Sequence, residues 1–478
     1  MRNIVPILML LALAAGCAAE ETQPSLPMPA PAQVTPAPVA PETTPAPAVA
    51  VAPPTVIEIA PDTAIFRRTP LIDGQITPGE WDIFYSVSES PLGGVTAYAD
   101  WDSSNLYIAV QSRNLQSMEV SLDLKDDGWY QGDDNYEIKI AGLAEGQEPV
   151  VHGRVYDSKA AKGDRLSGFS DVAISGVTVR TGGLADGRIA EVTIPVSILS
   201  LRPRDGAKLG LRIAATGQGG ACVPSDDAGD VTSCKLVSSK TSGPDNLGVQ
   251  MTIADTEVVV GQRLEVKLTF ENRGKEDIPA QYFVIGGEGR AARLLDSERR
   301  IVEGGLKPDQ RVRHTYRTLI SGGLGLGAWA VGAELRKPDD SRIAAALASF
   351  EIVEPYVFSV KSADFRTSGP HGQLKAKPAL VIRNNANWTI FGTVRISVPQ
   401  GWEVSPRAGE RQFSIEGENQ STAVPFELRA PANTPPGEYE ITFEVLIGKD
   451  THKVTHTLGV LEASAQEKPK PKPPTELP

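Results

Sequence analysis

The chain has 478 residues with a formal net charge of -12, and 22% of its residues are charged. This length accommodates two to four domains, each with its own hydrophobic core. The negative charge argues against nucleic acid as a partner, because no basic surface is expected to offset phosphate repulsion. The run "EKPKPKPP" near the C-terminus is too short and too proline-rich to form an anchor.

The N-terminal segment "MRNIVPILMLLALAAGC" has one arginine, an apolar run too short to span a bilayer, and small residues ending at Cys17. This pattern predicts an export signal. It resembles a bacterial lipoprotein signal, although Ala14 stands where leucine is usual. The resemblance implies a signal peptide over 1–17 with an acylated Cys17, and Ala18 favours an outer-membrane location. An ordinary cleaved signal is the alternative.

Residues 18–62 are dominated by proline, alanine, threonine and valine, a composition that cannot bury a core. Such a segment favours extended polyproline II conformations. We therefore expect a disordered linker that carries the folded part away from the membrane.

Alternating strand patterns begin near residue 65, in "NLYIAVQS", "MEVSLDL", "NYEIKIAG", "RIAEVTIPV" and "KLGLRIAAT". The turns between them are rich in glycine, aspartate and serine, and no long segment has the period of an amphipathic helix. The sequence therefore predicts a β-sandwich over 63–248.

Two further units, 249–354 and 355–462, each contain about seven short strand patterns, the number and size of an immunoglobulin-like sandwich. Residues 463–478 have the composition of a disordered tail. The predicted fold is all-β, with three tandem sandwiches after the linker.

With Cys17 assigned to lipid, Cys222 and Cys234 remain, separated by a polar, turn-rich stretch. Export places them where disulfides persist. The sequence predicts a Cys222–Cys234 disulfide that closes a small loop and contributes about 3 kcal/mol.

Four segments of the first unit occur in the order found in family 9 carbohydrate-binding modules and their DOMON-like relatives. They are "TPLIDGQITPGEWD", "AYADWDSSNLYIAV", "WYQGDDNYEIKI" and "AEVTIPVSILSLRPRDGAKLGLRIAAT". Residues 65–248 therefore resemble that family, and the first sandwich is expected to be of its jelly-roll type.

The resemblance implies sugar binding on one face of the sandwich, with calcium as a structural ion. Aromatic rings stack on sugar C–H faces while polar side chains bond the hydroxyls. The candidate contacts are Trp101, Trp129, Tyr130, Asp134, Glu137 and Arg154. Family members commonly clamp the sugar with a late tryptophan, whereas "SCKLVSSKTSGPDNLGV" contains no aromatic residue.

The third unit carries "NNANWTIFGTVRISVPQGWEVSP" and "FELRAPANTPPGEYEITFEV". It resembles the immunoglobulin-like domain beside the catalytic part of some bacterial alpha-galactosidases. The resemblance implies an accessory module of glycan-active proteins.

The acidic stretch "DLKDDGWYQGDD" has four possible roles: catalytic carboxylates, the rim of a binding face, a calcium site at Asp123 and Asp127, or a solvated turn. Catalysis by a glycosidase needs two carboxylates across a cleft, whereas these acids lie on one hairpin. Lys125 at a ligand position and flanking strands exclude an EF-hand. Strand alternation is expected to turn Trp129 and Tyr130 to opposite sides and to leave Glu137 available to a ligand.

The five histidines are scattered over the three units, and no nucleophile motif accompanies them. The sequence therefore predicts a non-enzymatic envelope lipoprotein that binds a polysaccharide or oligosaccharide. A structural scaffold that contacts other envelope proteins is one alternative. An accessory component of a glycoside-hydrolase system is another.

Overall fold

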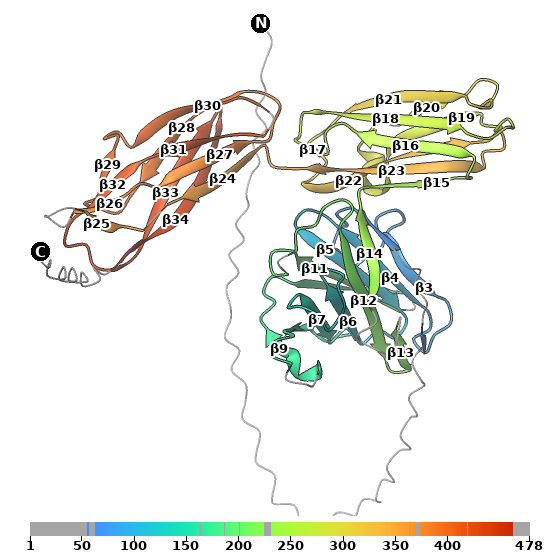
Figure 1. Ribbon diagram of the computed structural model, residues 1–478, viewed down its shortest axis with the longest axis horizontal. Helices are drawn as coiled ribbons and strands as arrows, with labels where there is room; N and C mark the ends of the chain where they lie inside the picture. The colour runs from blue at the N-terminus through green and yellow to red at the C-terminus, as the bar shows by residue number, and fades with distance from the viewer. Residues whose placement is uncertain are drawn as a thin grey trace, which may run out of the picture. The chain divides into compact units, whose positions relative to one another are not determined.

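The computed structural model describes residues 55–56, 63–161, 165–185, 187–199, 201–223, 231–362, 364–368, 373–417 and 419–461. The predicted signal with Cys17, most of the 18–62 linker and the 463–478 tail lie outside the described residues. Over the described part the chain forms strands and two 3-10 turns without an α-helix, which confirms the all-β prediction (Figure 1). Nor does that part contain a helix long and apolar enough to cross a membrane.

The first sandwich is one sheet with the strand order β10-β11-β5-β4-β2-β14-β12-β6-β7-β8-β9. Short strands β1 and β13 pair with each other, and β3 pairs with β4. The bounds are β1 (Thr55–Val56), β2 (Thr63–Arg67), β3 (Ile83–Val87), β4 (Val95–Trp101), β5 (Asn105–Ser112), β6 (Ser117–Asp123), β7 (Asn135–Ala141), β8 (Val150–Tyr156), η1 (Arg165–Gly168), β9 (Phe169–Val172), β10 (Thr178–Leu184), β11 (Gly187–Pro195), β12 (Lys208–Gly217), β13 (Gly220–Val223) and β14 (Thr232–Val237).

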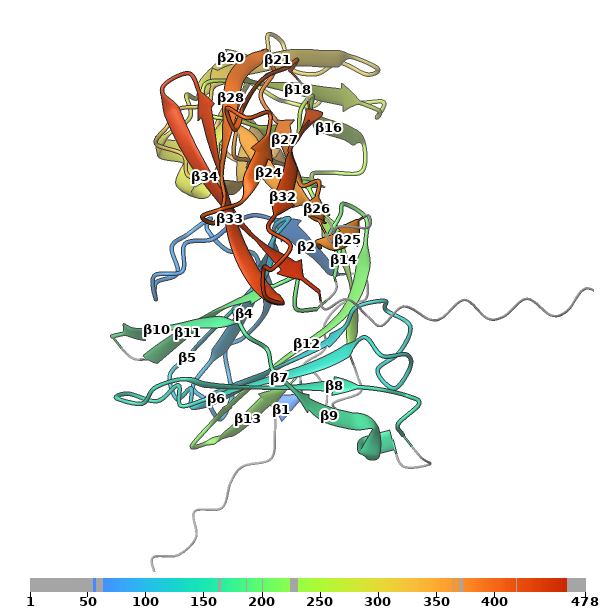
Figure 2. The ribbon, with the colours of Figure 1, turned by 90° about the vertical axis from the view of Figure 1, so that its left-hand side faces the viewer.

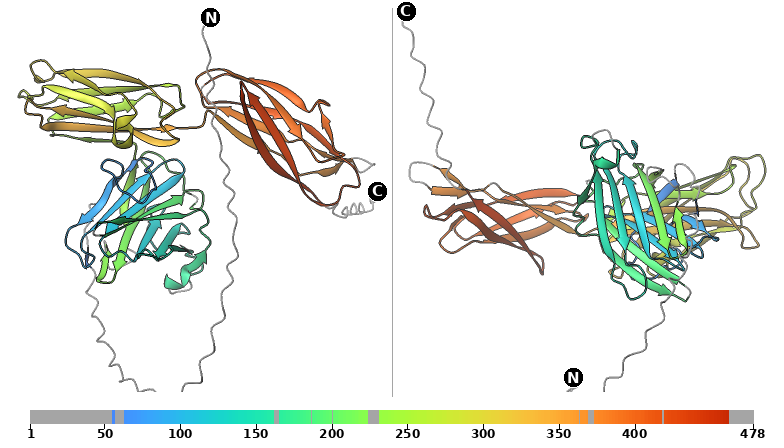
Figure 3. Two further views of the ribbon diagram at one scale, coloured as in Figure 1. Left: turned by 180° about the vertical axis from the view of Figure 1, so that it is seen from behind. Right: turned by 90° about the horizontal axis from the view of Figure 1, so that it is seen from below.

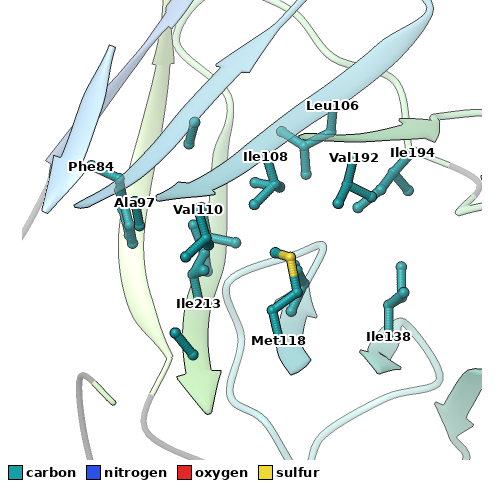
Figure 4. Close-up of a cluster of buried hydrophobic side chains, with 14 of the residues drawn as sticks. Phe84, Ala97, Leu106, Ile108, Val110, Met118, Ile138, Val192, Ile194 and Ile213 are labelled. Atoms are coloured by element: carbon teal, nitrogen blue, oxygen red, sulfur yellow. The ribbon is translucent and has the colours of Figure 1, made fainter. Parts of the chain in front are cut away.

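The two halves of this sheet enclose the core. Ile138 of β7 and Met118 of β6 lie on one side of it, and Ile108 of β5 and Val192 of β11 lie on the other (Figure 4). Successive side chains of a strand point to opposite faces. The polar residues between the apolar ones in β6, β7 and β8 therefore point away from the core.

A second, smaller apolar cluster covers the opposite face of β4 and β5. Trp81, Tyr98 and Tyr107 are buried there, and Ile72 and Ile76 pack against them. Both faces of β4 and β5 are thus covered, which agrees with the unbroken apolar run over residues 106–110 of β5.

The predicted disulfide is wrong, because Cys222 and Cys234 are separate buried thiols. Cys222 of β13 lies opposite Ala215 of β12, and Cys234 of β14 lies opposite Leu209 of the same strand. These positions lie six residues apart along β12, or about 20 Å at a strand's rise per residue. A disulfide requires Cα atoms within about 7 Å.

The second sandwich contains the sheets β15-β23-β22-β19-β20, with β17 also on β23, and β16-β18-β21. Its core includes the fully buried Tyr316, Phe270 and Phe350. The bounds are β15 (Ser239–Ser242), β16 (Leu247–Ile253), β17 (Glu257–Val258), β18 (Arg263–Asn272), β19 (Tyr282–Gly287), η2 (Gly289–Arg293), β20 (Glu298–Ile301), β21 (Arg311–Leu319), β22 (Gly327–Arg336) and β23 (Arg342–Ile352).

The junction between the first two sandwiches is one residue long. β14 ends at Val237 and pairs within the first sandwich, whereas β15 begins at Ser239 and pairs with β23. Ser238 alone separates the two strands. The second sandwich therefore begins about ten residues before the boundary placed at 248/249 from the sequence.

The third sandwich contains the sheets β24-β27-β31, β25-β26-β32-β29 and β30-β28-β33-β34, drawn in orange to red (Figure 3). Phe365, Phe426 and Phe443 are buried in its core. The bounds are β24 (Tyr356–Lys361), β25 (Arg366–Ser368), β26 (Gln373–Ala376), β27 (Ala379–Asn384), β28 (Ile390–Ser397), β29 (Glu403–Ser405), β30 (Glu410–Ile415), β31 (Gln420–Pro425), β32 (Glu427–Ala430), β33 (Gly437–Ile447) and β34 (Asp450–Val460).

Candidate functional site

A chain of ion pairs crosses the outward face of β12, β6, β7 and β8, which are neighbours in the sheet (Figure 2). We call Arg212, Glu119, Lys139, Glu137 and Arg154 the ion-pair face. The successive N–O distances are 2.8 Å for Arg212–Glu119, 3.4 Å for Lys139–Glu119, 3.0 Å for Lys139–Glu137 and 3.2 Å for Arg154–Glu137.

Positive and negative groups alternate along the ion-pair face, so each acid contacts two cations. One oxygen of Glu137 faces both Lys139 Nζ and Arg154 Nη1. Glu137 is only 6% exposed. The expectation that Glu137 is available to a ligand is therefore wrong for this conformation, because its two cations cover it.

Four aromatic rings pack at one end of this face. Trp129 lies in the turn between β6 and β7, and its ring centroid is 5.7 Å from that of Phe169 on β9. Phe169 is 5.1 Å from Tyr156 of β8, and Tyr156 is 5.7 Å from Tyr130. Trp129 is 3% exposed, so it is a packing residue and not the flat contact surface predicted for it.

Tyr130 and Arg154 remain accessible at this end. Both side chains are half-buried, and the Arg154 guanidinium lies 4.8 Å from the Phe169 ring centroid. Folding thus brings the predicted Glu137 and Arg154 into contact, and Tyr130 is linked to Arg154 through the Tyr156 and Phe169 rings. A half-exposed ring beside a guanidinium can stack on a sugar while the guanidinium bonds its hydroxyls.

Trp101 lies on the other half of the sheet, at the end of β4. It is 3% exposed, and its Nε1 donates a 3.0 Å hydrogen bond to the Ile65 carbonyl. The prediction of Trp101 as a binding platform is therefore wrong, because β2 and the core enclose the indole.

The neighbouring Asp102 organises the turn that follows β4. Its Oδ1 accepts hydrogen bonds from the backbone N–H groups of Ser104 and Asn105, both at 2.8 Å. Its Oδ2 accepts from the hydroxyls of Tyr107 and Thr69, both at 2.6 Å. The "ADWD" segment that carried part of the family resemblance thus has a structural role in this chain.

Asp123, Asp127 and Asp134 form an acidic loop in which one carboxylate oxygen from each lies within 4.8 Å of the others. Asp123 ends β6, and its Oδ2 accepts a 2.7 Å bond from the Gly128 N–H. This bond closes the loop over the aspartate. The structure therefore brings together both residues predicted as metal ligands and adds Asp134.

The electrostatics of the acidic loop favour a cation. Desolvation raises the pKa of Asp127, with further contributions from Asp134 and Asp123. Lys125 Nζ lies 3.0 Å from Asp134 Oδ1, and this hydrogen bond raises the pKa of the lysine. The buried Oδ2 of Asp134 has no hydrogen-bond partner among the described residues. Three hard oxygen donors, one of them unpartnered, fit Ca²⁺.

Glu191 of β11 is a buried acid that the sequence did not single out. It is fully buried, and its Oε2 accepts a 2.7 Å bond from the Gly74 N–H. Burial raises its pKa to about 7, with smaller contributions from Asp73 and Glu80. Unlike Glu137, it has no basic side chain within ion-pair distance among the described residues.

Sequence reasoning also missed Phe169 and the ion-pair partners Glu119, Lys139 and Arg212. Phe169 stands alone in the polar segment "SGFSDV", and its isolation was the available signal. The partners alternate with apolar residues in their strands. Only the register of β12, β6 and β7 reveals that they meet.

Residues 386–448 match the family model described as "NPCBM-associated, NEW3 domain of alpha-galactosidase". The match lies within the third sandwich and supports the resemblance expected there. The predicted resemblance of residues 65–248 to family 9 modules stays a prediction. A comparison with curated proteins found no match.

Solved structures similar to the chain include a transglutaminase from red sea bream, at 12% identity and a TM-score of 0.27, over 73% of this chain and 57% of that one. Alpha-2-macroglobulins also match. A Salmonella variant has 12% identity, a TM-score of 0.21 and coverage of 78% and 31%. The native E. coli protein has 12% identity, a TM-score of 0.20 and coverage of 77% and 32%. The chain thus spans from about a third to just over half of these structures, and TM-scores this low do not establish a shared fold.

Proposed function

We propose that this protein is a non-catalytic, lipid-anchored component of the bacterial cell envelope that binds carbohydrate through its first sandwich. The observation that carries the proposal is the row of contacts that runs from Tyr130 through Tyr156 and Phe169 to Arg154 at one end of the ion-pair face. The match of residues 386–448 to a domain of alpha-galactosidase supports a role near glycans.

The proposed contact is narrower than the one expected from the sequence. Tyr130 and Phe169 supply partly exposed ring surface, and Arg154 supplies charged N–H donors to sugar hydroxyls. Trp101 and Trp129 support the fold and do not touch the ligand. Cys17 and the linker attach the protein to the outer membrane and let the sandwich reach away from it.

The test is affinity electrophoresis of residues 18–478 through gels that contain one polysaccharide each. A retarding polysaccharide identifies the ligand. Tyr130→Ala is then expected to weaken retardation roughly 3- to 10-fold, the value of one stacking contact. Phe391→Ala, which removes a 68% exposed ring from the third sandwich, is the matched control and is expected to change nothing. Free migration of the parent in every gel contradicts the proposal.

A structural scaffold is the second candidate, and the burial of both Trp101 and Trp129 favours it. Such a scaffold would migrate freely in every polysaccharide gel. It would instead remain with a defined set of envelope proteins after cross-linking in intact cells.

The match to an alpha-galactosidase domain favours a third role, as accessory to a glycoside hydrolase. In that role the protein would accelerate an alpha-galactosidase on an insoluble galactose-bearing polysaccharide. It would leave hydrolysis of a small soluble galactoside unchanged, because no surface needs to be targeted.

We also infer that the acidic loop of Asp123, Asp127 and Asp134 binds Ca²⁺. The donors are carboxylate oxygens, which Ca²⁺ prefers, and the partnerless Oδ2 of Asp134 offers a free acceptor. The ion would offset two of the three negative charges of these acids and fix the turn that contains Trp129.

A further inference from the structure

The outward face of the sheet β16-β18-β21 in the second sandwich is strongly basic. Leu264, Val266, Leu268 and Phe270 of β18 point into the core, so the residues between them point outward. The antiparallel register places Glu271 opposite Arg311, and Thr269 opposite Arg313. We call this surface the arginine face.

The arginine face carries six basic and two acidic side chains, a net charge of +4 on a chain whose total is -12. The acids are Glu265 and Glu271, and the bases are Arg263, Lys267, Arg273, Arg311, Arg313 and Arg317. In sequence these residues alternate with apolar ones, so they never form a basic run. The folded protein nevertheless presents a local positive field that its total charge conceals.

A hollow of about 260 Å³ lies at one end of this face, among Arg273, Arg311 and Arg313. Gly248 of β16 makes room for it. A Cβ atom on this glycine would come within 2.6 Å of Arg273 Cζ, so the Arg273 guanidinium lies directly over its backbone. Gln250 and Thr269 complete the lining with an amide and a hydroxyl.

Glu271 holds two of the three guanidinium groups. Arg273 Nε lies 3.2 Å from its Oε2, and Arg311 Nη2 donates to its Oε1. The hydrogen bond from Arg311 lowers the pKa of Glu271, which therefore stays ionised. Each guanidinium has five N–H donors, so most of them remain free after this contact.

Arg313 has no carboxylate within ion-pair distance among the described residues, although both neighbouring arginines share Glu271. Three guanidinium groups around one acid give the hollow an excess of two positive charges. Planar guanidinium groups bind carboxylate and sulfate oxygens through paired hydrogen bonds. The hollow therefore fits one such anionic group.

The rest of the arginine face fits a hydrophilic polymer better than other anionic partners. Thr252, Thr269 and Thr315 lie between its charged side chains and can bond hydroxyl groups. The outward positions of these three strands carry no aromatic ring. This argues against single-stranded nucleic acid, whose bases stack on aromatic side chains. It also argues against a membrane surface, which favours proteins that insert aromatic side chains. A protein partner would require an apolar centre depleted in charge.

We propose that the arginine face binds an acidic polysaccharide and seats one of its carboxylate or sulfate groups among Arg273, Arg311 and Arg313. This site is on a different sandwich from the proposed carbohydrate site. It is expected to operate whether or not the first sandwich binds sugar.

The test is affinity electrophoresis of residues 18–478 in gels containing polygalacturonate, with a neutral galactan as comparator. Polygalacturonate is expected to retard the protein and added salt to abolish the retardation, because binding releases counterions. The double variant Arg311→Gln with Arg313→Gln is expected to lose at least tenfold in apparent affinity. The dependence of log affinity on log salt should become shallower by about 1 to 2.

The matched control is the double variant Arg293→Gln with Arg342→Gln, which removes the same charge from exposed positions off this face. It is expected to change affinity less than twofold. Arg313→Lys keeps the charge but loses the planar fork, so it should have an intermediate effect. The circular dichroism spectrum of each variant checks that the fold is retained.

Three results would overturn the proposal. They are equal retardation of the Tyr130→Ala variant by the neutral galactan and by polygalacturonate, equal affinity of both double variants for polygalacturonate, and binding to phosphatidylglycerol vesicles without binding to polygalacturonate. Tyr130→Ala should leave polygalacturonate retardation unchanged. Failure at the arginine face and failure at the first sandwich can therefore be told apart.

Discussion

The ion-pair face and the arginine face are both outward faces of antiparallel sheets, yet they differ in charge balance. In the ion-pair face, Glu119 and Glu137 each contact two cations, and Glu137 is buried beneath them. In the arginine face, Glu265 and Glu271 contact only four of the six bases, and Arg263 and Arg313 have no ionic partner among the described residues. Where positive and negative side chains alternate, they pair with one another within the protein. Where bases outnumber acids, some N–H donors remain available to an external anion.

The largest expected effect concerns the aromatic end of the ion-pair face. Trp129→Ala should destabilise the first sandwich by about 3 to 5 kcal/mol, because it leaves a cavity beside Phe169. Tyr130→Ala should cost far less, because that ring is half-exposed. Hydrogen exchange of β7 and β8 measures both. Small and equal losses of stability in the two variants would contradict the packing role of Trp129 and make it a candidate ligand contact again.

The second prediction concerns Glu191. Glu137 is a buried acid that contacts two cations, whereas Glu191 is a buried acid with no cation within ion-pair distance among the described residues. The folded-state pKa of Glu191 is about 7, above the ordinary value of 4.5. Its contribution to stability is therefore complete below about pH 4.5 and is lost as the pH rises through 7. From pH 5 to pH 8 the loss should be on the order of 2 kcal/mol.

Glu191→Gln should remove this pH dependence, because the amide does not titrate. Hydrogen exchange of β5 and β11 at several pH values is the measurement. Glu145→Gln, at a fully exposed position of the same sandwich, is the control. A parent and a Glu191→Gln variant with the same pH profile would contradict the assignment.

The third prediction concerns calcium in the acidic loop. At a free concentration 100 times its dissociation constant, the ion should stabilise the first sandwich by about 2.7 kcal/mol. Thermal unfolding in calcium and in EDTA measures the shift. Asp127→Asn should reduce it, while Asp133→Asn, outside the three-acid group, should preserve it. Identical unfolding temperatures in both buffers would exclude the ion.

The smallest effects come from removing one acid from each face. Glu137→Gln should destabilise the first sandwich by about 1 to 2 kcal/mol, because Lys139 and Arg154 lose a buried partner. Glu271→Gln should produce no measurable change in stability, because its surroundings are exposed and solvated. Urea unfolding of the two variants compares them directly, and equal losses would erase the distinction between the faces.

Much of the fold could be predicted because strand alternation is a local property. "NLYIAVQS" is β5 residue for residue, and "NYEIKIAG" differs from β7 by one residue at its end. The all-β prediction follows from such segments. The start of the second sandwich was placed too late because "SSKTSGPD", which contains β15, has the composition of a loop. Only its pairing with β23 makes it a strand.

The candidate site was predicted less well because burial and register depend on distant segments. Trp129 is covered by Phe169, forty residues further along the chain, and Trp101 is bonded to Ile65 on β2. The two cysteines are far apart because β13 and β14 pair with opposite ends of β12. The arginine face had a sequence signal, the alternating basic residues of "RVRHTYR", but these residues form no continuous basic run.

The one-residue junction at Ser238 has a practical consequence for taking the protein apart. A fragment cut between residues 248 and 249 would remove β15 from β23 and divide β16. The trimmed second sandwich would then expose an unpaired strand edge, the kind of surface on which chains aggregate side by side. Insolubility of such a fragment would then be due to the position of the cut. A cut at Ser238 would leave every strand in the fragment that contains its sheet.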